Sequence, residues 1–575
     1  MRDRRAQATP PNAGLLRIRP PHAADCAADA RRTPPPAAPL TVLRQWQERA
    51  LERLAEWDQG SFLLSAAPGA GKTIPSLAFA RRLLDAGIVN RVHVVCPTTP
   101  LTRQWAEVGG LFGIQLAPDC EELHPPRDFD GIAATYARVA SSAKRWAPQC
   151  GARTLIIADE AHHLGDELAW GEGFARAFAA TPRWLLLSGT PFRSDGSPIA
   201  GVRYDAGGMC LPDVSYTYAD AVRDGICRPV VFVPYDGVLS WQSGDDVIES
   251  SFADSELSGR EASRRYRTAI STELADGLPR ILRAADERLG EVRLTGHRDA
   301  GGLVVTADGA HARRVATVLK QITGRSPVVV VHTDARAAAK LRAFRAGRER
   351  WIVAVNMVSE GVDIPRLRVG VYATAAKTPL MFRQIVGRFV RTLAGRPAEH
   401  SYLFLPADRL LRAHAAEVES ELRHVLRAVG EDPLDAFDEP PIRRRSESTE
   451  PDAFLALNAD VAPQLALFGG GPPPPAAPAA PAAKPAIAAA AGFPPAVAEE
   501  PIFQRRRRLR DKRTGLVRTL AGMEGRTYRE INSWLNRQTK VDSVDAATVA
   551  QLERSIELLG AELDRIGRRR ARRAS

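Results

Sequence analysis

The stretch Ala66-Ala67-Pro68-Gly69-Ala70-Gly71-Lys72-Thr73 decides the fold of this chain. It follows an apolar run, Ser61–Ser65, that is typical of a buried strand, and it precedes a helical pattern from Ile74 to Ala80. A strand, a glycine-rich turn, a lysine, a hydroxyl and a helix together form a cradle for phosphate groups. Lys72 is expected to neutralise β- and γ-phosphate oxygens, and Thr73 to ligate Mg²⁺. We therefore predict a nucleoside triphosphate site formed by Pro68, Gly69, Ala70, Gly71, Lys72 and Thr73.

Length and composition indicate a soluble protein with several domains. At roughly 150 residues per domain, 575 residues allow three or four domains. No apolar run reaches the roughly 18 residues that a membrane span needs, and the N-terminus lacks the apolar core of a secretion signal. The six cysteines are widely spaced and form no CxxC pair, which argues against a zinc site or a disulfide framework. We expect a cytoplasmic, bacterial-type protein that associates with the nucleoid and not with a membrane.

The net charge of +12 is concentrated at the two ends of the chain. Residues 501–575 contain 19 Lys and Arg against 9 Asp and Glu, and residues 1–40 contain 7 Arg against 3 Asp. The body between them is therefore close to neutral. Basic ends indicate a polyanionic partner, most simply nucleic acid. The alternative interpretation is solubilising disorder without a specific partner.

Alternating strand-like runs and helical stretches predict an α/β protein with two blocks of parallel sheet. The predicted boundaries are 1–40 for a disordered basic N-terminus, 41–235 for the first α/β domain, 236–295 for a helical connector, 296–430 for the second α/β domain, 431–504 for a Pro/Ala-rich linker and 505–575 for a small basic helical region. The strands expected in the second block are Gly302–Thr306, Val328–His332, Ile352–Val355, Val369–Tyr372 and Tyr402–Leu405.

The C-terminal region has helix signals of its own. Thr527-Tyr528-Arg529-Glu530 is a plausible capping box, from which a helix continues through Leu535. An apolar seam at helical spacing follows, formed by Val549, Leu552, Ile556, Leu559, Leu563 and Ile566. We expect this seam to pack against the preceding helix rather than to form a dimer. Trp534 is expected in the small helical core, although base stacking by Tyr528 and Trp534 is an alternative.

An acidic pair follows the strand-like run that ends at Ala158. Asp159 and Glu160 would lie at the carboxyl end of that strand, where α/β sheets bind ligands. Asp159 can hold Mg²⁺, and Glu160 can accept a proton from an attacking water molecule. An Asp-Glu pair after a strand is often structural. Because this pair lies 87 residues after Lys72, we interpret it as the second part of the triphosphate site.

The acidic pair and its surroundings resemble the motifs of a known family. Asp159-Glu160-Ala161-His162 resembles the DEAH box of superfamily 2 helicases and translocases, and the resemblance extends over residues 40–410. The other motifs of that family are resembled, in order, by Leu43–Gln47 (the adenine-reading segment), Val95–Trp105 (motif Ia), Ala134–Tyr136 (the next strand-contacting motif), Ser188–Pro191 (motif III), Leu303–Thr306 (motif IV), Asn356–Pro365 (motif V) and Gln384–Arg391 (motif VI, as QxxGRxxR).

The resemblance implies two tandem RecA-like domains with ATP and Mg²⁺ bound between them. It implies that Gln384, Arg388 and Arg391 sense the γ-phosphate, with Arg388 and Arg391 as arginine fingers instead of surface ion-pair partners. It assigns a base contact to Gln47, and a place beside the nucleotide to Gly361 and Asp363, with Asp363 near the ribose. ATP binding would then close the cleft between the domains, and hydrolysis would reopen it.

The same resemblance places one nucleic-acid strand across both domains. Thr98, Arg103, Thr135 and Thr306 are the residues expected to contact its phosphates, which would position a strand without reading its sequence. Each of these four residues could instead cap a helix or lie in a solvated loop. The basic clusters at Arg505–Arg513 and Arg568–Arg573 are further candidates for phosphate contact.

Some details narrow the resemblance. Ala66 stands where the wider phosphate-loop pattern prefers glycine, which superfamily 2 members often accept. His163 extends the box to DEAHH and Trp105 closes motif Ia, and both resemble DNA-directed members related to restriction-enzyme motors and XPB-type helicases. The segment after residue 410 has no recognisable nuclease constellation.

We therefore expect an ATP-dependent DNA helicase or translocase. One alternative is an RNA helicase. Another is a motor subunit of a restriction, defence or repair assembly that acts with a nuclease, methyltransferase or repair partner. A third is a nucleic-acid-binding protein whose ATPase is inactive, which the intact acidic and arginine motifs argue against.

Overall fold

The computed structural model describes residues 43–574, with gaps at residues 119, 121–122, 124, 167, 190–198, 206–209, 244–245, 255–256, 258, 332, 335, 356–363, 394–398, 428–454 and 464–499. The expectations for residues 1–40 and for most of the linker therefore lie outside the described residues. Within the described part of the chain, no helix is long and apolar enough to cross a membrane. The five cysteines in this part are all free thiols.

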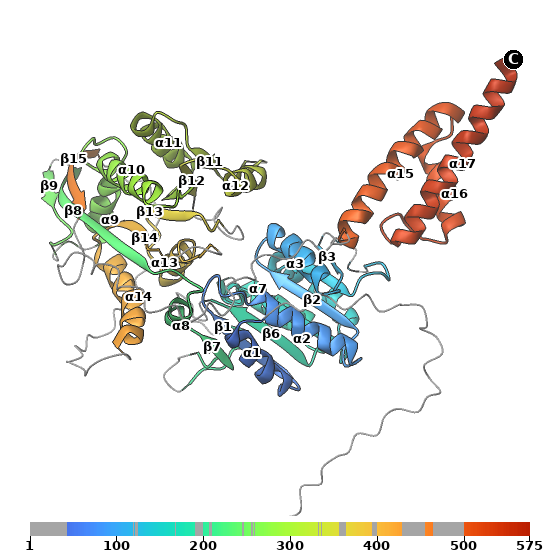
Figure 1. The fold of residues 1–575 in the computed structure, drawn as a ribbon, viewed down its shortest axis with the longest axis horizontal. Coiled ribbons are helices and arrows are strands. Elements are labelled where there is room, and N and C mark those ends of the chain that lie inside the picture. Colours follow the sequence, from blue (N-terminus) through green and yellow to red (C-terminus); the bar gives the residue numbers. More distant parts are fainter. Residues whose placement is uncertain are drawn as a thin grey trace, which may run out of the picture. The chain divides into compact units, whose positions relative to one another are not determined.

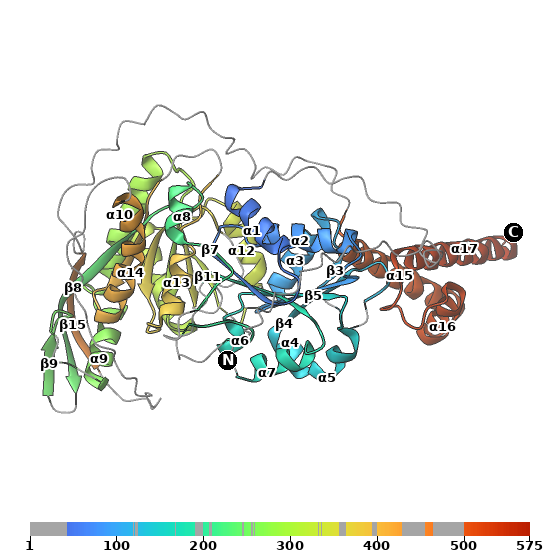
Figure 2. The ribbon, with the colours of Figure 1, turned by 90° about the horizontal axis from the view of Figure 1, so that it is seen from below.

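The first domain is built on a parallel sheet in the order β3-β4-β2-β5-β6-β1-β7 (Figures 1 and 2). Its strands are β1 (Gly60–Ala66), β2 (Arg91–Cys96), β3 (Leu116–Ala117), β4 (Gly131–Thr135), β5 (Thr154–Asp159), β6 (Arg183–Ser188) and β7 (Val214–Tyr216). Its helices are α1 (Gln45–Ala55), α2 (Thr73–Asp85), α3 (Thr99–Leu111), α4 (Tyr136–Ser141), α5 (Ala143–Trp146), a 3₁₀ turn (Ala147–Gln149), α6 (His163–Asp166), α7 (Leu168–Ala177) and α8 (Tyr218–Arg223).

Helices cover both faces of this first sheet. Figure 2 shows α1, α2 and α3 on one face and α4, α5 and α7 on the other. Two separate apolar clusters lie in these two layers, one including Leu77 and Leu155, the other including Phe174 and Ile156. Every residue of β5 is buried, because neighbouring residues of a strand face opposite layers and both layers are covered.

The second domain has a sheet in the order β11-β12-β10-β13-β14-β8-β15, with β9 paired to β8. Its strands are β8 (Val230–Ser243), β9 (Asp246–Ser250), β10 (Gly301–Thr306), β11 (Val328–Val330), β12 (Trp351–Val355), β13 (Leu367–Ala373), β14 (Ser401–Pro406) and β15 (Leu455–Pro463). Its helices are α9 (Gly259–Ala269), α10 (Leu278–Leu294), α11 (Gly309–Thr323), α12 (Ala337–Ala346), α13 (Pro379–Val386) and α14 (Arg409–Arg427). The α/β prediction with two tandem, mainly parallel sheets is confirmed.

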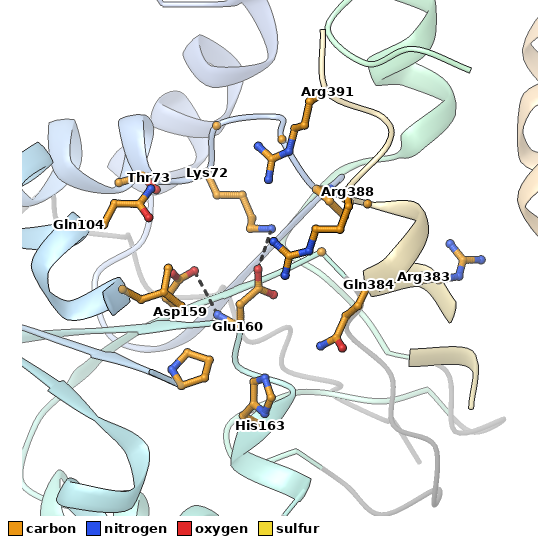
Figure 3. A pocket seen from close by; sticks show the side chains of 17 residues that line it. Lys72, Thr73, Gln104, Asp159, Glu160, His163, Arg383, Gln384, Arg388 and Arg391 are labelled. Carbon is orange, nitrogen blue, oxygen red and sulfur yellow. Dashed lines mark hydrogen bonds and ion pairs between the residues drawn. The ribbon is translucent and has the colours of Figure 1, made fainter. Parts of the chain in front are cut away.

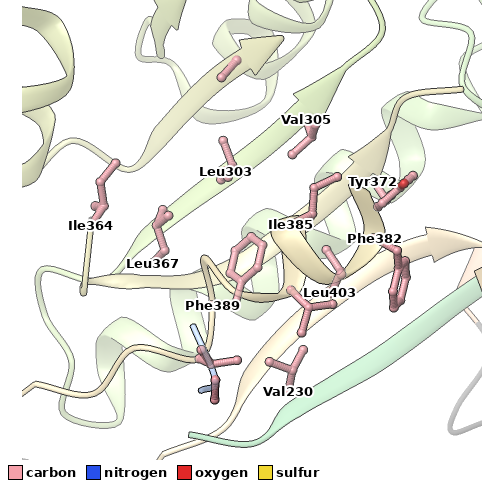
Figure 4. Close-up of a cluster of buried hydrophobic side chains, with 14 of the residues drawn as sticks. Val230, Leu303, Val305, Ile364, Leu367, Tyr372, Phe382, Ile385, Phe389 and Leu403 are labelled. Atoms are coloured by element: carbon pink, nitrogen blue, oxygen red, sulfur yellow. The ribbon is translucent and has the colours of Figure 1, made fainter. Parts of the chain in front are cut away.

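The core of the second domain fixes α13 on the sheet (Figure 4). Phe382 and Ile385 of this helix are buried together with Tyr372 of β13 and Leu403 of β14. Thr378 caps the helix, because its side chain accepts a hydrogen bond from Met381 N, and Pro379 occupies the first turn. This packing holds the residues after α13 at the edge of the domain.

Two predicted segments differ from the structure. The stretch predicted as a helical connector, 236–295, contains most of the long strand β8 and all of β9 before its helices begin. The stretch predicted as a linker, 431–504, contains β15, which pairs antiparallel with β8, and the first residues of α15 (Ile502–Glu524). Apolar residues alternate from Leu455 to Val461, a strand signal that the Pro/Ala composition around it obscured.

The C-terminal region is a three-helix module of α15, α16 (Tyr528–Thr539) and α17 (Val549–Ala574). Its core is formed by Val517, Leu520, Ile531, Leu535, Leu559 and Ile566. The capping box predicted at Thr527 is confirmed, since Thr527 and Glu530 cap each other's backbone amides. The apolar seam of α17 packs against α15 and α16, as the prediction of intramolecular packing required.

Candidate active site

The phosphate loop runs from the end of β1 to the first residue of α2. Gly69 and Gly71 have φ values of +85° and +90°, a conformation that L side chains rarely adopt. A Cβ on Gly69 would lie 2.7 Å from Arg391 Cδ, and one on Gly71 would lie 3.1 Å from Gln47 Nε2. Both positions therefore require glycine for backbone conformation and for space. The loop, with Lys72 and Thr73, lines a cavity of about 200 Å³ (Figure 3).

Lys72 is buried at the floor of this cavity. Its Nζ donates a hydrogen bond to Ala66 O at 3.2 Å and lies 3.8 Å from Glu160 Oε1. Ser76 Oγ donates to Lys72 O at 2.9 Å, which steadies the first turn of α2. Figure 3 shows the ammonium group turned towards Glu160. The two opposite charges thus face each other across the cavity, with room for groups that would separate them.

Asp159 ends β5 and is held from three directions. Trp105 Nε1 of α3 donates to Asp159 Oδ2 at 2.8 Å, and Glu160 N donates to Oδ1 at 3.1 Å. Tyr136 Oη of α4 donates to the backbone oxygen of Asp159 at 2.7 Å. Burial and the neighbouring Glu160 raise the pKa of Asp159 to about 6, against the opposing effects of Lys72 and the Trp105 hydrogen bond.

Glu160 stays ionised at neutral pH. Burial alone would raise the pKa of Glu160. Lys72, His162 and His163 more than offset that effect and lower the pKa. The residue has a φ of +52°, which is uncommon outside glycine. Backbone strain of this kind costs of order 1–3 kcal/mol and occurs where the surrounding structure requires it, often at functional sites.

His162 connects the acidic pair with both domains. Its Nδ1 lies 3.1 Å from Ser188 Oγ at the end of β6 and 3.6 Å from Glu160 Oε2. Its Nε2 lies 3.4 Å from Gln384 Nε2 of α13. Because an amide nitrogen only donates, this geometry fits an imidazole whose proton is on Nδ1. The chain of contacts links β5, β6 and the second domain within one small volume.

The second domain contributes side chains to the same cavity from the end of α13. Gln384, Gly387, Arg388 and Arg391 line it together with the phosphate loop. Figure 3 shows the side chains of Gln384, Arg388 and Arg391 at the cavity. The approach is close, since a Cβ on Gly387 would lie 2.9 Å from Pro68 Cβ. Arg383 also lines the cavity, but Glu417 and Glu421 of α14 pair with its guanidinium at 2.8 and 2.5 Å.

Backbone contacts hold the arginine segment to the chain that enters β8. Arg228 N donates to Val390 O at 2.7 Å, and Thr392 Oγ1 donates to Ile226 O at 2.9 Å. An isolated bridge pairs Cys227 with Arg391. The position of Arg391 over the phosphate loop therefore depends on a segment more than 160 residues earlier in the sequence.

The segment before α1 supports the phosphate loop. Gln47, expected as the base contact, is buried, and its Nε2 donates to Gly71 O at 3.0 Å. Its Oε1 accepts from Arg44 N at 3.0 Å. Arg44 Nη1 donates to Ala70 O at 2.7 Å, a contact that sequence reasoning missed although Arg44 lies within the quoted segment. In this structure, both side chains hold the loop.

Three further residues of the segment Val95–Trp105 line the cavity and were not predicted: Pro97, Leu101 and Gln104. Leu101 and Gln104 of α3 lie three residues apart, so that they share one helix face. Figure 3 shows Gln104 beside Thr73. The sequence signal that could have identified Leu101 and Gln104 is their position about one helical turn or less before Trp105, whose indole donates a hydrogen bond to Asp159.

The four residues expected to contact nucleic acid do not line the cavity. Arg103 is exposed on α3, and Thr98 precedes that helix. Thr135 caps α4, because its Oγ1 accepts from Arg138 N at 3.3 Å. Thr306 differs from the expectation: it is completely buried, and its hydroxyl donates to Ala354 O at 3.1 Å. Since its one hydroxyl proton is used inside the sheet, Thr306 presents no group to a strand.

Gly361 and Asp363, expected beside the nucleotide, lie outside the described residues, as do Thr190 and Pro191 of motif III. Ile364 and Pro365 of motif V are described, and Pro365 O accepts a hydrogen bond from Arg228 Nη2 at 3.1 Å.

The oxygen donors in the cavity suit Mg²⁺. Thr73 offers a hydroxyl and Asp159 a carboxylate, and both line the same cavity. In the ranges that the structure describes, no group of three or more His, Cys, Asp and Glu side chains could hold a metal alone. Mg²⁺ usually keeps several waters and takes one or two carboxylates together with substrate phosphates. The residues present therefore fit a metal that binds with the triphosphate.

Comparison with known proteins gives matches over both domains. The family model "Type III restriction enzyme, res subunit" matches residues 40–193, and the model "Helicase conserved C-terminal domain" matches residues 290–392. The chain is 40% identical over 442 residues to the uncharacterized protein Rv2917 of Mycobacterium tuberculosis, which covers 74% of this chain and 72% of the relative.

Two other matches are more distant. The chain is 26% identical over 373 residues to the DNA 3'-5' translocase XPB2 of Sulfurisphaera tokodaii, covering 61% of this chain and 78% of the relative. A solved structure of S. cerevisiae Dbp5 bound to RNA and ADP BeF3 aligns with a TM-score of 0.43 at 17% identity, over 66% of this chain and 87% of that one.

Proposed function

Because the chain belongs to superfamily 2 of the helicases and translocases, with relationships to restriction-enzyme motors and XPB-type proteins, we propose that it is a DNA-dependent ATPase that moves along DNA. The observation that carries the proposal is the two-sided cavity. Lys72, Asp159 and Glu160 enter it from one RecA-like domain, and Gln384, Arg388 and Arg391 from the other. Only the approach of both domains assembles the full set of charges.

The side chains divide the chemistry of ATP hydrolysis between them. Lys72, Arg388 and Arg391 surround the position of the γ-phosphate with positive charge, which phosphoryl transfer requires more than covalent catalysis. Glu160, held as a carboxylate, orients the attacking water and accepts its proton. Mg²⁺ held by Thr73 and Asp159 would neutralise phosphate charge.

Coupling to movement follows from the contacts between domains. Gln384 and His162 join α13 to the acidic pair, and Ser188 joins the same histidine to β6. Loss of the γ-phosphate would remove the anion that attracts Arg388 and Arg391 to the phosphate loop. The two domains would then separate and change their hold on the strand, a ligand-driven closure of a common kind.

The direct test is ATP turnover with and without DNA in two variants, Lys72→Ala and Glu160→Gln. We expect each to lower DNA-stimulated kcat by at least about a hundredfold, because each removes a charge or base that acts in the transition state. Lys320→Ala, an exposed lysine on α11, is the control and should behave as the unmodified protein. Full turnover in either active-site variant would refute the site.

Separate measurements decide whether the protein moves along DNA or RNA. The match to the XPB2 translocase favours DNA, so stimulation by duplex DNA should exceed stimulation by RNA of equal length. The second candidate is a motor subunit of a restriction or defence assembly that moves without separating strands, and the match to the restriction res-subunit model favours an assembly of that class. Displacement of a triplex-forming strand without displacement of a duplex strand would support that second candidate. Stimulation by RNA alone would refute the DNA assignment.

A further inference from the structure

The C-terminal helical module carries a cluster of cations that the ATP site does not use. Residues 501–575 have an excess of ten positive charges, and the sequence concentrates seven basic residues between Arg505 and Arg513. The structure shows that most of these basic side chains form ion pairs or hydrogen bonds with nearby residues of the chain. Arg505, Arg508 and Arg510 form ion pairs with Glu553, Glu500 and Asp545.

Two arginines of the same run are structural. Arg506 is buried, and its Nη2 donates to Asp545 O and Ala547 O at 2.9 and 2.8 Å. Arg513 is also buried and donates to Asn532 Oδ1 at 2.8 Å. Buried guanidinium groups with backbone and amide acceptors join α15 to its neighbours. They are not available to an external anion.

Arg507 and Lys512 of the run are exposed, and two further exposed cations lie together on α16. Arg529 and Arg537 are exposed, and neither forms an ion pair or hydrogen bond with any residue that the structure describes. With Ser533 between them, they recur every four residues and therefore share one helix face. They line a shallow notch together with Arg526 and Glu530.

The other charged groups of the notch are already engaged. Glu530 Oε2 accepts hydrogen bonds from Thr527 N and Oγ1 at 2.8 and 2.9 Å. The carboxylate is therefore held by the capping box at the start of α16. Arg526 lies over the ring of Trp534 at 5.7 Å and 3.4 Å from Glu524. The notch thus presents Arg529, Ser533 and Arg537 outward as unsatisfied donors.

We infer that this face of α16, defined by Arg529, Ser533 and Arg537, is a second nucleic-acid contact that binds the phosphate backbone. At 1.5 Å per residue, the two arginines stand about 12 Å apart along the helix. One strand of duplex carries a phosphate charge every 3.4 Å or so along its axis, so this span faces three or four phosphates. Unpaired guanidinium groups with a hydroxyl between them suit phosphate oxygens and read no sequence.

The test is equilibrium binding of the full chain without nucleotide, so that it does not depend on the proposed motor activity. Binding of fluorescent single-stranded DNA, duplex DNA and RNA is followed by anisotropy between 50 and 300 mM KCl. For Arg529→Ala/Arg537→Ala we expect about tenfold weaker binding at low salt and a slope of log Kd against log salt smaller by about two on duplex DNA. The three ligands show which nucleic acid the face accepts.

Two further variants separate this face from general charge. Arg529→Lys/Arg537→Lys keeps both charges and should keep the salt slope. Arg554→Ala/Arg565→Ala removes the same charge from exposed, ion-paired positions on α17 and should bind as the unmodified protein does. Unchanged affinity and slope in Arg529→Ala/Arg537→Ala, or an equal loss in the α17 variant, would overturn the inference. Circular dichroism melts verify that each variant is folded.

Discussion

At the scale of single residues, the decisive contact is between Trp105 and Asp159. The indole is buried and donates its one hydrogen bond to a buried carboxylate, which the sequence placed only as a metal ligand. Tyr136 holds the backbone of the same residue. Trp105 and Tyr136 belong to helices whose N-cap residues, Thr98 and Thr135, were expected to contact nucleic acid. If that prediction holds, these helices would connect the nucleic-acid contact with Asp159.

Trp105→Phe keeps the packing of an aromatic ring but removes the donor. A hydrogen bond to a charged group contributes roughly 1.5–3 kcal/mol, so we expect kcat for ATP to fall about ten- to a hundredfold. The pKa of Asp159 should rise further, because one of the groups that lower it is lost. ATP turnover between pH 6 and 8 measures both effects. Trp57→Phe is the control, because this indole also donates one hydrogen bond but does not line the cavity, and equal kcat in all three proteins would contradict the prediction.

At the scale of elements, helices cover both faces of the first sheet, so that a polar side chain on an inner strand is buried and needs a hydrogen-bond partner within the sheet. His93 on β2 is buried, and its Nδ1 accepts a hydrogen bond from Ile132 N of β4 at 3.2 Å. Burial, with a smaller contribution from Arg91, lowers its pKa from 6.5 to about 3. The neutral imidazole thus joins two strands. Protonation would add a buried charge and would remove the lone pair on Nδ1 that accepts the hydrogen bond from Ile132 N.

This histidine makes the first domain sensitive to acid. Its folded pKa lies below its unfolded value, so the stability it provides is complete above pH 6.5 and is lost as pH falls towards 3. The loss is at most about 1.4 kcal/mol per pH unit. His93→Asn keeps an acceptor for Ile132 N and should flatten this dependence.

Hydrogen exchange of the β2 and β4 amides between pH 6.5 and 4.5, corrected for intrinsic rates, measures the effect. His311→Asn, at a buried histidine of α11 in the other domain, is the matched control and should leave these amides unchanged. The same pH dependence in His93→Asn and the unmodified protein would show that His93 is not the titrating group.

At the scale of the molecule, side chains of the two domains meet at the cavity. Gln384 contacts His162 at 3.4 Å, and Arg391 covers Gly69 so closely that no side chain fits there. These contacts connect the cavity to the arrangement of the domains. Under the proposed function, a strand that favoured the closed arrangement would raise ATP turnover.

Gln384→Ala should interrupt that connection. We expect DNA-stimulated kcat to fall at least about tenfold, while DNA affinity without nucleotide changes less than twofold, because the residue lies in the ATP cavity. Gln321→Ala, an exposed glutamine on α11, is the control. Stimulated turnover and anisotropy binding, measured on the same preparations, decide the outcome. Weaker DNA binding with normal maximal turnover would assign Gln384 to the strand instead.

Much of the fold was predictable because its signals are local. Continuous apolar runs marked the strands β10 to β14 of the second sheet within one or two residues, since a strand buried on both faces, as four of these five are, needs apolar side chains throughout. The strand β15 was missed because its short alternation lies within Pro/Ala-rich sequence, and its partner β8 is more than 200 residues away. The roles of Lys72, Glu160 and Arg391 remain predictions, although the structure brings them to one cavity.

The sequence by itself determined the order of the motifs, the α/β class and the excess of positive charge at the C-terminus. Only the tertiary structure decided which side chains meet. It placed Trp105 on Asp159, used Gln47 to hold the phosphate loop and enclosed Thr306. It also left Arg529 and Arg537 unpaired, while it paired or buried five of the seven basic residues between Arg505 and Arg513. The physical reason is that strand and helix formation follow neighbouring residues, whereas charge pairing and burial depend on segments that packing brings together from distant parts of the chain.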